Sequence, residues 1–155
     1  MVYLLISVLI LNSAAYFVPK HLKRQEIYST ALFSFLLGLT IDVIFAFKYH
    51  LYGYFAAGVQ MSSFLAIAGL FPATGILYLN FYPAKESILK QFIYILSWTA
   101  FCLFYEWTAI ISGFFYYSGW KMYYSALTYP VLLIMHLIHL SLFRHLKNRG
   151  DTFLS

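Results

Sequence analysis

Two carboxylates lie inside long apolar segments, where they could act as an acid, a base or a proton relay. Asp42 lies fifteen residues into the apolar run 27–47, and Glu106 lies fifteen residues into the run 91–111. A charge inside a membrane costs free energy, so such residues usually face the protein interior and mark functional sites. With about six further residues before the membrane boundary, each carboxylate is expected about 9 Å below that boundary at a rise of about 1.5 Å per residue. Asp42 and Glu106 are therefore the candidate catalytic residues.

Small side chains accompany both carboxylates at helical spacing. Gly38 and Ala46 flank Asp42 at steps of four residues, and a similar stripe surrounds Glu106. Small residues let a second helix approach closely within a membrane, so both carboxylates are expected to point into the protein. A purely structural role, as hydrogen-bond partners between helices, is the alternative.

Aromatic residues crowd the segments around and after the carboxylates. The candidate substrate-binding residues among them are Tyr105, Trp107, Tyr116 and Trp120. Aromatic rings with a polar tip settle at the headgroup level of a bilayer, so they could form an interfacial belt. They could equally form the wall of a binding site that opens toward the outer leaflet, and composition does not decide between these two roles.

Two histidines, His136 and His139, are three residues apart and share one face of the last apolar run. Two histidines without a further ligand at a defined spacing are a weak metal pattern, so no metal site and no cofactor are predicted. We expect both histidines to form hydrogen bonds to hydroxyls such as those of Thr128 and Tyr129. Asn12 is expected to form a hydrogen bond between helices.

The overall composition indicates a membrane protein. Of 155 residues, 63% are hydrophobic and 10% are charged, against about 45–50% and about 25% in soluble domains. One span needs about 20 residues, so the chain has room for five or six spans and none for a soluble catalytic domain. It contains no P-loop, Rossmann glycine pattern or nucleophile elbow. The basic excess indicates topology, and no nucleic-acid partner is expected.

Five apolar runs are expected to position these residues: 2–18, 27–47, 61–82, 91–111 and 126–143. Each is near membrane-crossing length, and the first lacks the basic start of a signal peptide, so we expect it to be retained. The predicted fold class is all-α, a polytopic integral membrane helical bundle with five transmembrane helices. Residues 1–155 are expected to form a single transmembrane domain.

Basic residues divide unequally between the two sides of such a bundle. Eight of the ten Lys and Arg fall on one side, three of them in the tail 144–155, while Lys48 and Lys121 fall on the other. Positive charge accumulates on the cytoplasmic side of a membrane. The N-terminus is therefore expected outside and the basic tail in the cytoplasm, where it sets topology or also attracts anionic lipid.

A faint internal repeat has the order carboxylate, glycine with two aromatics, proline. Its members are Asp42, Gly53 to Phe55 and Pro72, followed by Glu106, Gly113 to Phe115 and Pro130. The carboxylate and the proline are thirty residues apart in the first unit and twenty-four in the second. A duplicated helical hairpin would bring the two carboxylates into related positions.

A set of motifs runs through nearly the whole chain: Asp42, Leu51 to Phe55, Asn80 to Pro83, Tyr105 to Trp107, Gly119 to Lys121, Tyr124 to Ala126 and Tyr129-Pro130. This set resembles a family of small polytopic membrane proteins of endospore-forming Gram-positive bacteria. The resemblance implies the bacterial cytoplasmic membrane and no particular activity.

The stretch from Glu106 to Trp120 more distantly resembles membrane-embedded carotenoid cyclases and hydratases, in which an acidic residue precedes a turn rich in glycine and aromatics. That resemblance implies protonation of an isoprenoid double bond. A desolvated carboxylic acid would supply the proton, and aromatic faces would stabilise the carbocation.

Three functions follow, in order of preference. The first is a structural, accessory or interaction role without catalysis. The second is a lipid- or isoprenoid-modifying enzyme that uses Asp42 and Glu106 as acid and base. The third is a proton-coupled carrier subunit with the same carboxylates as its relay. Membrane lipids are the expected partners, together with a second copy of the chain or another membrane protein.

Overall fold

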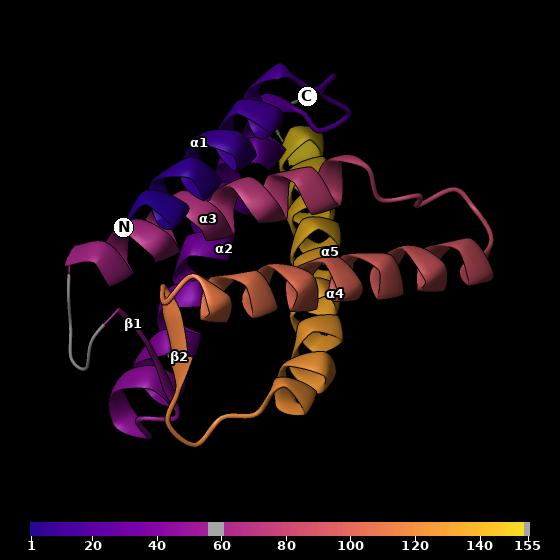
Figure 1. The fold of residues 1–155 in the computed structure, drawn as a ribbon. Helices are drawn as coiled ribbons and strands as arrows, with labels where there is room; N and C mark the ends of the chain where they lie inside the picture. Colours follow the sequence, from indigo (N-terminus) through magenta and orange to yellow (C-terminus); the bar gives the residue numbers. More distant parts are fainter. Residues whose placement is uncertain (56–60, 154–155) are drawn as a thin grey trace.

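The computed structural model describes residues 1–55 and 61–153, and the side chains within 1–55 and 63–149. In chain order the elements are α1 (Val2–Phe17), α2 (Arg24–Asp42), η1 (Val43–Lys48), β1 (Tyr52–Tyr54), α3 (Met61–Asn80), α4 (Ile88–Ile111), β2 (Phe115–Tyr117) and α5 (Met122–Phe153). Five α-helices follow the five predicted runs in order (Figure 1), which confirms the predicted helical class for this part of the chain. The paired strands β1 and β2 lie where only connections were expected.

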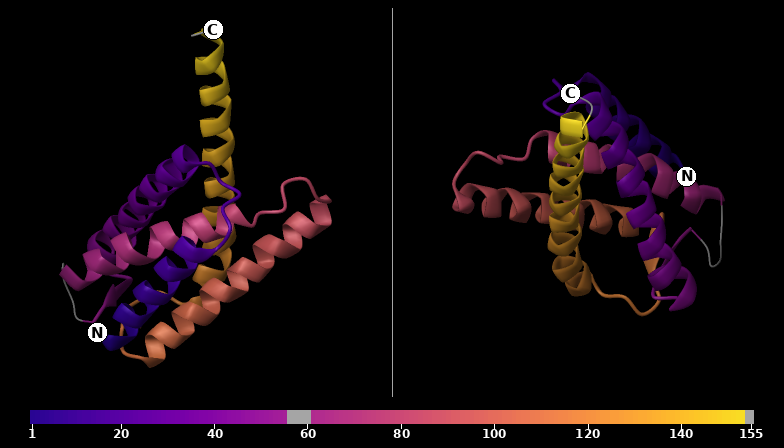
Figure 2. Two further views of the ribbon diagram at one scale, coloured as in Figure 1. Left: turned by 90° about the horizontal axis from the view of Figure 1, so that it is seen from above. Right: turned by 180° about the vertical axis from the view of Figure 1, so that it is seen from behind.

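Three helices extend beyond the predicted runs. α2 and α4 each begin three residues earlier, and in α2 the Glu26 carboxylate accepts the backbone N–H of Lys23 (2.8 Å), which satisfies a donor at the helix start. α5 begins four residues earlier and continues past residue 143 through the basic tail. Residues 144–149 contain neither proline nor glycine, so nothing in them ends the helix. The last turns of α5 extend beyond the other helices (Figure 2).

α3 lies at the centre of the fold, where it packs against α1, α2 and α5 (Figure 1). Asn12 of α1 donates from Nδ2 to the carbonyl oxygen of Gly69 in α3 (2.8 Å), which confirms the expected bond between helices. A Cβ at Gly38 of α2 would lie 2.8 Å from the ring of Phe71 in α3. The approach of α2 to α3 therefore requires glycine at this position.

α2 and α5 run antiparallel and are joined by three polar contacts, which we call the polar ladder. Its members are Arg144 Nε with Glu26 Oε1 at 2.6 Å, Ser29 Oγ with His139 Nε2 at 3.2 Å, and Ser34 Oγ with His136 Nε2 at 2.9 Å. α4 also packs on α5, but it lies across that helix in all three views (Figures 1 and 2). The fold thus combines an antiparallel helix pair with a crossing helix.

Large apolar side chains cover much of the outer surface. On α4, Phe104, Trp107 and Ile111 follow one another at helical spacing with 61%, 49% and 66% of their surface exposed. A continuous apolar face of this kind marks a membrane or protein contact.

In the part of the chain that the structure describes, four helical segments are long and apolar enough to cross a membrane: Arg24–Lys48, Ser63–Asn80, Ile88–Ile111 and Met122–Arg149. α1, the predicted first span, is a shorter apolar helix of 16 residues. At about 1.5 Å per residue it is about 24 Å long, less than the roughly 30 Å of a hydrocarbon core.

The buried apolar residues form two clusters. One joins α1, β1, α3 and the end of α4, with Leu4, Ala66 and Phe114 at its centre. The second cluster joins the segment before α2 to the end of α3 and to α5, with Tyr78 and Leu133 among its members. Residues of both clusters line a pocket that also receives the two carboxylates. This pocket is the candidate functional site.

Candidate functional site

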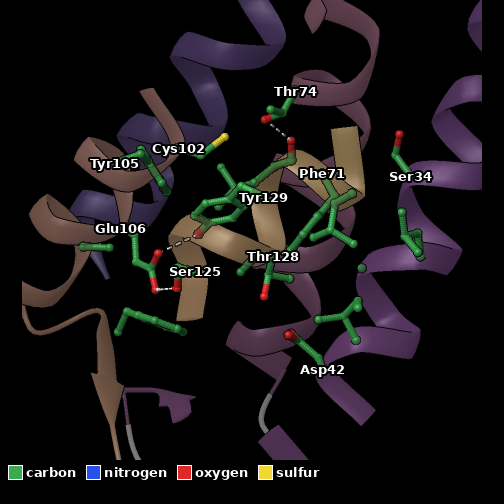
Figure 3. Close-up of a pocket in the computed structure, with 18 of the residues that line it drawn as sticks. Ser34, Asp42, Phe71, Thr74, Cys102, Tyr105, Glu106, Ser125, Thr128 and Tyr129 are labelled. Atoms are coloured by element: carbon green, nitrogen blue, oxygen red, sulfur yellow. Dashed lines mark hydrogen bonds between the residues drawn. The ribbon is translucent and has the colours of Figure 1, made fainter. Parts of the chain in front are cut away.

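Glu106 is the centre of a hydrogen-bond network between α4, β2 and α5. Its Oε1 accepts the hydroxyls of Tyr117 (2.6 Å) and Ser125 (2.7 Å), and its Oε2 accepts that of Tyr129 (2.8 Å). The indole Nε1 of Trp120 donates to Ser125 Oγ (2.7 Å). Figure 3 shows the bonds to Ser125 and Tyr129. Both oxygens of this buried carboxylate are therefore occupied by protein donors.

Asp42, the last residue of α2, has a different environment. Only 1% of its surface is exposed. Its Oδ1 accepts the hydroxyl of Tyr52 (2.7 Å), while Oδ2 has no hydrogen-bond partner among the described residues. Leaving a buried acceptor unsatisfied costs about 1–3 kcal/mol, and more for a charged group. Asp42 thus offers one open acceptor atom.

The two short strands supply a tyrosine to each carboxylate. β1 and β2 pair antiparallel with Tyr52 opposite Tyr117, so the two side chains lie on the same face of the ladder. Tyr52 donates to the carboxylate of the helix that precedes β1, and Tyr117 donates to the carboxylate of the helix that precedes β2. The pairing of β1 with β2 therefore positions both tyrosine hydroxyls beside their carboxylates.

The tyrosines beside the carboxylates are neutral. Burial, and then the charge of Asp42, raises the pKa of Tyr52 far above its usual range. Burial and the hydrogen bond to Glu106 likewise raise the pKa of Tyr117. The pKa of Tyr54 is raised by burial, then by the charge of the nearby Asp42 and by the interaction of its hydroxyl with that carboxylate. The geometry of this approach does not reach that of a hydrogen bond to Oδ2. The phenols therefore keep their protons at physiological pH.

A π-helical segment, η1, directly follows Asp42. π-Helical turns are rare and occur mostly at functional sites, because the wider turn displaces side chains from regular α-helical positions. Phe45, within η1, lies against the ring of Trp120 with centroids 5.3 Å apart. The segment thus brings an aromatic wall to the pocket beside Asp42.

The pocket has a volume of about 210 Å³ and is lined mainly by apolar and aromatic side chains from α2, α3, α4, α5 and the strands. A single water needs only about 10–15 Å³ measured in this way, so the space accepts a much larger molecule. Figure 3 shows Glu106 and Asp42 entering it from different helices, with Ser125 and Thr128 of α5 between them.

Three residues that line this pocket carry a buried polar atom with no hydrogen-bond partner within the described part of the chain. These atoms are Asp42 Oδ2 and the hydroxyls of Tyr78 and Tyr105. Buried polar groups are normally hydrogen-bonded to protein or to ordered water. Three such groups around one apolar space leave polar contacts open to a bound molecule.

The histidines of α5 belong to the polar ladder. His136 has Nδ1 on the carbonyl oxygen of Leu132 (2.8 Å), which can only accept, so Nδ1 carries a proton. The expected partners Thr128 and Tyr129 were wrong, because Tyr129 donates to Glu106 and Thr128 to a backbone carbonyl. Among the side chains that the structure describes, within 1–55 and 63–149, no three His, Cys, Asp or Glu gather closely enough to hold a metal.

The sequence-predicted site residues separate into two groups. Asp42, Glu106, Tyr105 and Trp120 all line the pocket. Trp107 does not, because one helical step of about 100° from Glu106 turns it to the exposed face of α4.

Tyr116 also lies outside the pocket lining, since it covers Gly53 across the strand pair. A Cβ on that glycine would lie 2.5 Å from the Tyr116 hydroxyl. Four pocket or network residues were not among the predicted site residues: Tyr52, Tyr117, Ser125 and Tyr129. The spacing of a tyrosine ten or eleven residues after each carboxylate is the signal that could have identified two of them.

Comparison of this chain with protein-family models, with curated proteins and with solved structures found no match. A function for this chain is therefore inferred from its own geometry.

Proposed function

We propose that this chain is a small multi-pass protein of the bacterial cytoplasmic membrane with a non-catalytic, accessory role: it binds one amphiphilic molecule from the membrane in its central pocket. The observation that carries the proposal is the unpaired, buried Oδ2 of Asp42 in a space with apolar walls. An apolar wall with a few convergent polar groups is the usual form of a small-molecule site.

The exposed apolar side chains support the membrane location, and the uneven distribution of Lys and Arg supports the topology. The exposed apolar rows suit contact with lipid tails. The eight-to-two division of Lys and Arg favours five spans with the N-terminus outside and the tail in the cytoplasm. In that orientation Asp42 and the strand pair lie toward the outer leaflet. The resemblance to membrane proteins of endospore-forming bacteria favours the same membrane.

The chemistry of the pocket defines the class of ligand. Asp42 Oδ2 is an acceptor and needs a donor, so the polar end of the ligand carries a hydroxyl or an amine. The hydroxyls of Tyr78 and Tyr105 offer further polar contacts along the walls. The body of the ligand is hydrocarbon, because most of the lining is aliphatic or aromatic. An isoprenoid or acyl-chain alcohol or amine satisfies each of these conditions.

The test is a comparison of co-purifying lipids. The full chain and its Asp42→Asn variant are purified in a gentle detergent, and the bound material is extracted and identified by mass spectrometry. Asparagine keeps the shape but replaces a carboxylate oxygen by a donor, so the occupancy of the ligand should fall at least tenfold. Glu86→Gln is the matched control, since Glu86 is an exposed carboxylate paired with Lys90. Equal occupancy in Asp42→Asn and wild type would contradict the proposal.

An isoprenoid-modifying enzyme is the second candidate, favoured by the aromatic rings near Asp42. Tyr52 lies 5.1 Å from Phe115 and 5.8 Å from Trp120 between ring centroids. Such faces stabilise a carbocation, and a protonated Asp42 could deliver the proton that forms it. Glu106 fits the role of a base poorly, because three hydroxyls occupy its oxygens. Conversion of the bound molecule by wild type, but not by an Asp42→Asn variant that still binds it, would favour the enzyme.

A further inference from the structure

A second, separate site is found beside the polar ladder, where the first turn of α2 meets the end of α5. An open groove there is lined by Arg24, Gln25 and Tyr28 from α2 and by Phe143, Leu146 and Lys147 from α5. None of these residues lines the central pocket. The groove is therefore independent of that pocket.

The groove carries two uncompensated positive charges. Arg144, next to it on α5, is neutralised by Glu26 through contacts of 2.6 Å from Nε and 3.3 Å from Nη2. Arg24 and Lys147 take part in no ion pair among the side chains that the structure describes. Both residues line the groove, Arg24 from α2 and Lys147 from α5. An anion between them would be attracted by both.

Beside each cation, an aromatic side chain of the same helix lies about one turn further from the charged helix end. Tyr28 follows Arg24 by four residues along α2, and Phe143 precedes Lys147 by four residues along the antiparallel α5. One helical turn is about 5.4 Å, so each helix places a ring about one turn further from its charged end. Tyr28 and Leu146 are mostly exposed, at 74% and 58%.

The order of a positive charge followed by apolar side chains matches the structure of an anionic phospholipid. A phospholipid carries its phosphate at the membrane surface and its hydrocarbon one step deeper. In the proposed topology the start of α2 and the end of α5 lie at the cytoplasmic surface, where anionic lipids attract basic residues. Basic pockets between helices on that side bind anionic headgroups.

We propose that this groove binds one anionic phospholipid of the cytoplasmic leaflet, with its phosphate between Arg24 and Lys147 and one acyl chain along Tyr28, Phe143 and Leu146. The inference uses the membrane location given under the proposed function but not the central pocket or its ligand. The neutral pair of Glu26 with Arg144 holds the two helices together under the phosphate, so the groove exists before the lipid arrives.

The experiment measures lipid binding to the full chain in detergent micelles by native mass spectrometry, with phosphatidylglycerol and phosphatidylcholine as probes. Wild type should bind phosphatidylglycerol more tightly than phosphatidylcholine. Each cation removed should weaken phosphatidylglycerol binding about fivefold, equivalent to about 1 kcal/mol per basic residue. The double variant Arg24→Gln, Lys147→Gln should thus lose about 25-fold. Binding of phosphatidylcholine, in which the choline cation offsets the phosphate charge, should weaken much less.

Matched controls separate this site from general charge and from the pocket. Lys85→Gln removes an exposed cation outside the groove and should leave both affinities unchanged. Tyr28→Ser alters an exposed side chain and should weaken both lipids equally. Asp42→Asn should retain the phosphatidylglycerol preference, so failure of the pocket proposal is visible separately. Equal binding of the two lipids by wild type, a double variant that binds like wild type, or an equal loss in Lys85→Gln would overturn the groove site.

Discussion

The two membrane carboxylates differ in how many of their oxygens are satisfied. Glu106 accepts three hydroxyls and so links α4 to β2 and α5, whereas Asp42 accepts one hydroxyl and keeps an oxygen open. A buried carboxylate whose two oxygens both accept hydrogen bonds from the protein stabilises the fold. A carboxylate with an unbonded oxygen is available to a ligand. We therefore assign Glu106 a structural role and Asp42 a binding role.

The structural role of Glu106 predicts a loss of stability. Glu106→Ala should lower the free energy of unfolding by about 3 kcal/mol or more, because it leaves three hydroxyls without their acceptor at about 1–3 kcal/mol each. Tyr129→Phe, which removes one of these bonds, should cost about 1 kcal/mol. Thermal unfolding in detergent measures both, with Glu86→Ala as the exposed control. A Glu106→Ala protein as stable as wild type would show that the network is dispensable.

The sequence predicted the two carboxylates and their burial, because charged residues inside apolar runs face the protein interior, and the neighbouring small residues indicate which face that is. It did not predict their partners. Tyr52 and Tyr117 belong to the aromatic segments for which an interfacial belt and the wall of a binding site were both predicted, since composition does not show which hydroxyl reaches which carboxylate. Trp107 was predicted to bind substrate, but it points to the exposed face of α4, because adjacent helical residues point in different directions.

Between elements, the polar ladder fixes how α2 lies against α5. Its outermost contact joins Glu26, which is 5% exposed, to Arg144. The Glu26 carboxylate also caps the start of α2 through the N–H of Lys23. One side chain thus determines both where the helix begins and which helix it pairs with.

Removal of the basic partner should therefore be costly. Arg144→Gln leaves the Glu26 carboxylate buried without its cation, and we expect a loss of about 2 kcal/mol, below the roughly 3–5 kcal/mol of fully buried pairs because Arg144 is half exposed. Lys90→Gln is the matched control, since its pair with Glu86 is exposed and surface pairs contribute about 0–1 kcal/mol. Equal unfolding temperatures for the two variants would contradict this role of the ladder.

Helices were predictable here and strands were not, for a physical reason. Runs of about 20 apolar residues are a strong signal, and all five helices follow them. β1 and β2 have three residues each, too few for an alternating pattern, and they depend on pairing across roughly 60 residues of chain. The helical tail was also not predicted, because the end of the last span was placed where the apolar run ends, while the helix continues through the basic residues that follow.

At the scale of the whole molecule, the two halves share an arrangement. In each, a helix ending near a carboxylate is followed by a short strand whose tyrosine donates to that carboxylate, and then by a helix containing a proline. The antiparallel pairing of β1 with β2 relates the two strands by a local twofold axis. This supports the internal repeat, which stays a prediction.

The topology predicts which side of the membrane each turn occupies. Cys102 is the only cysteine in the sequence. In a Cys102→Ala background, a cysteine placed at Lys121 should react with a membrane-impermeant maleimide in intact cells, whereas one placed at Lys23 should not. Both should react once the cells are permeabilised. Reaction at position 23 in intact cells would place the basic loops outside and contradict the charge-based orientation.

The most direct measurement for the central claim is an experimental structure of the full chain, purified with its native lipids, at a resolution that shows bound molecules. We predict continuous density for one elongated non-protein molecule in the pocket, with a donor atom within about 3.2 Å of Asp42 Oδ2. The same density should be absent from Asp42→Asn. A wild-type pocket that is closed by protein, with Asp42 Oδ2 bonded to another residue, or that holds only water, would contradict ligand binding at Asp42.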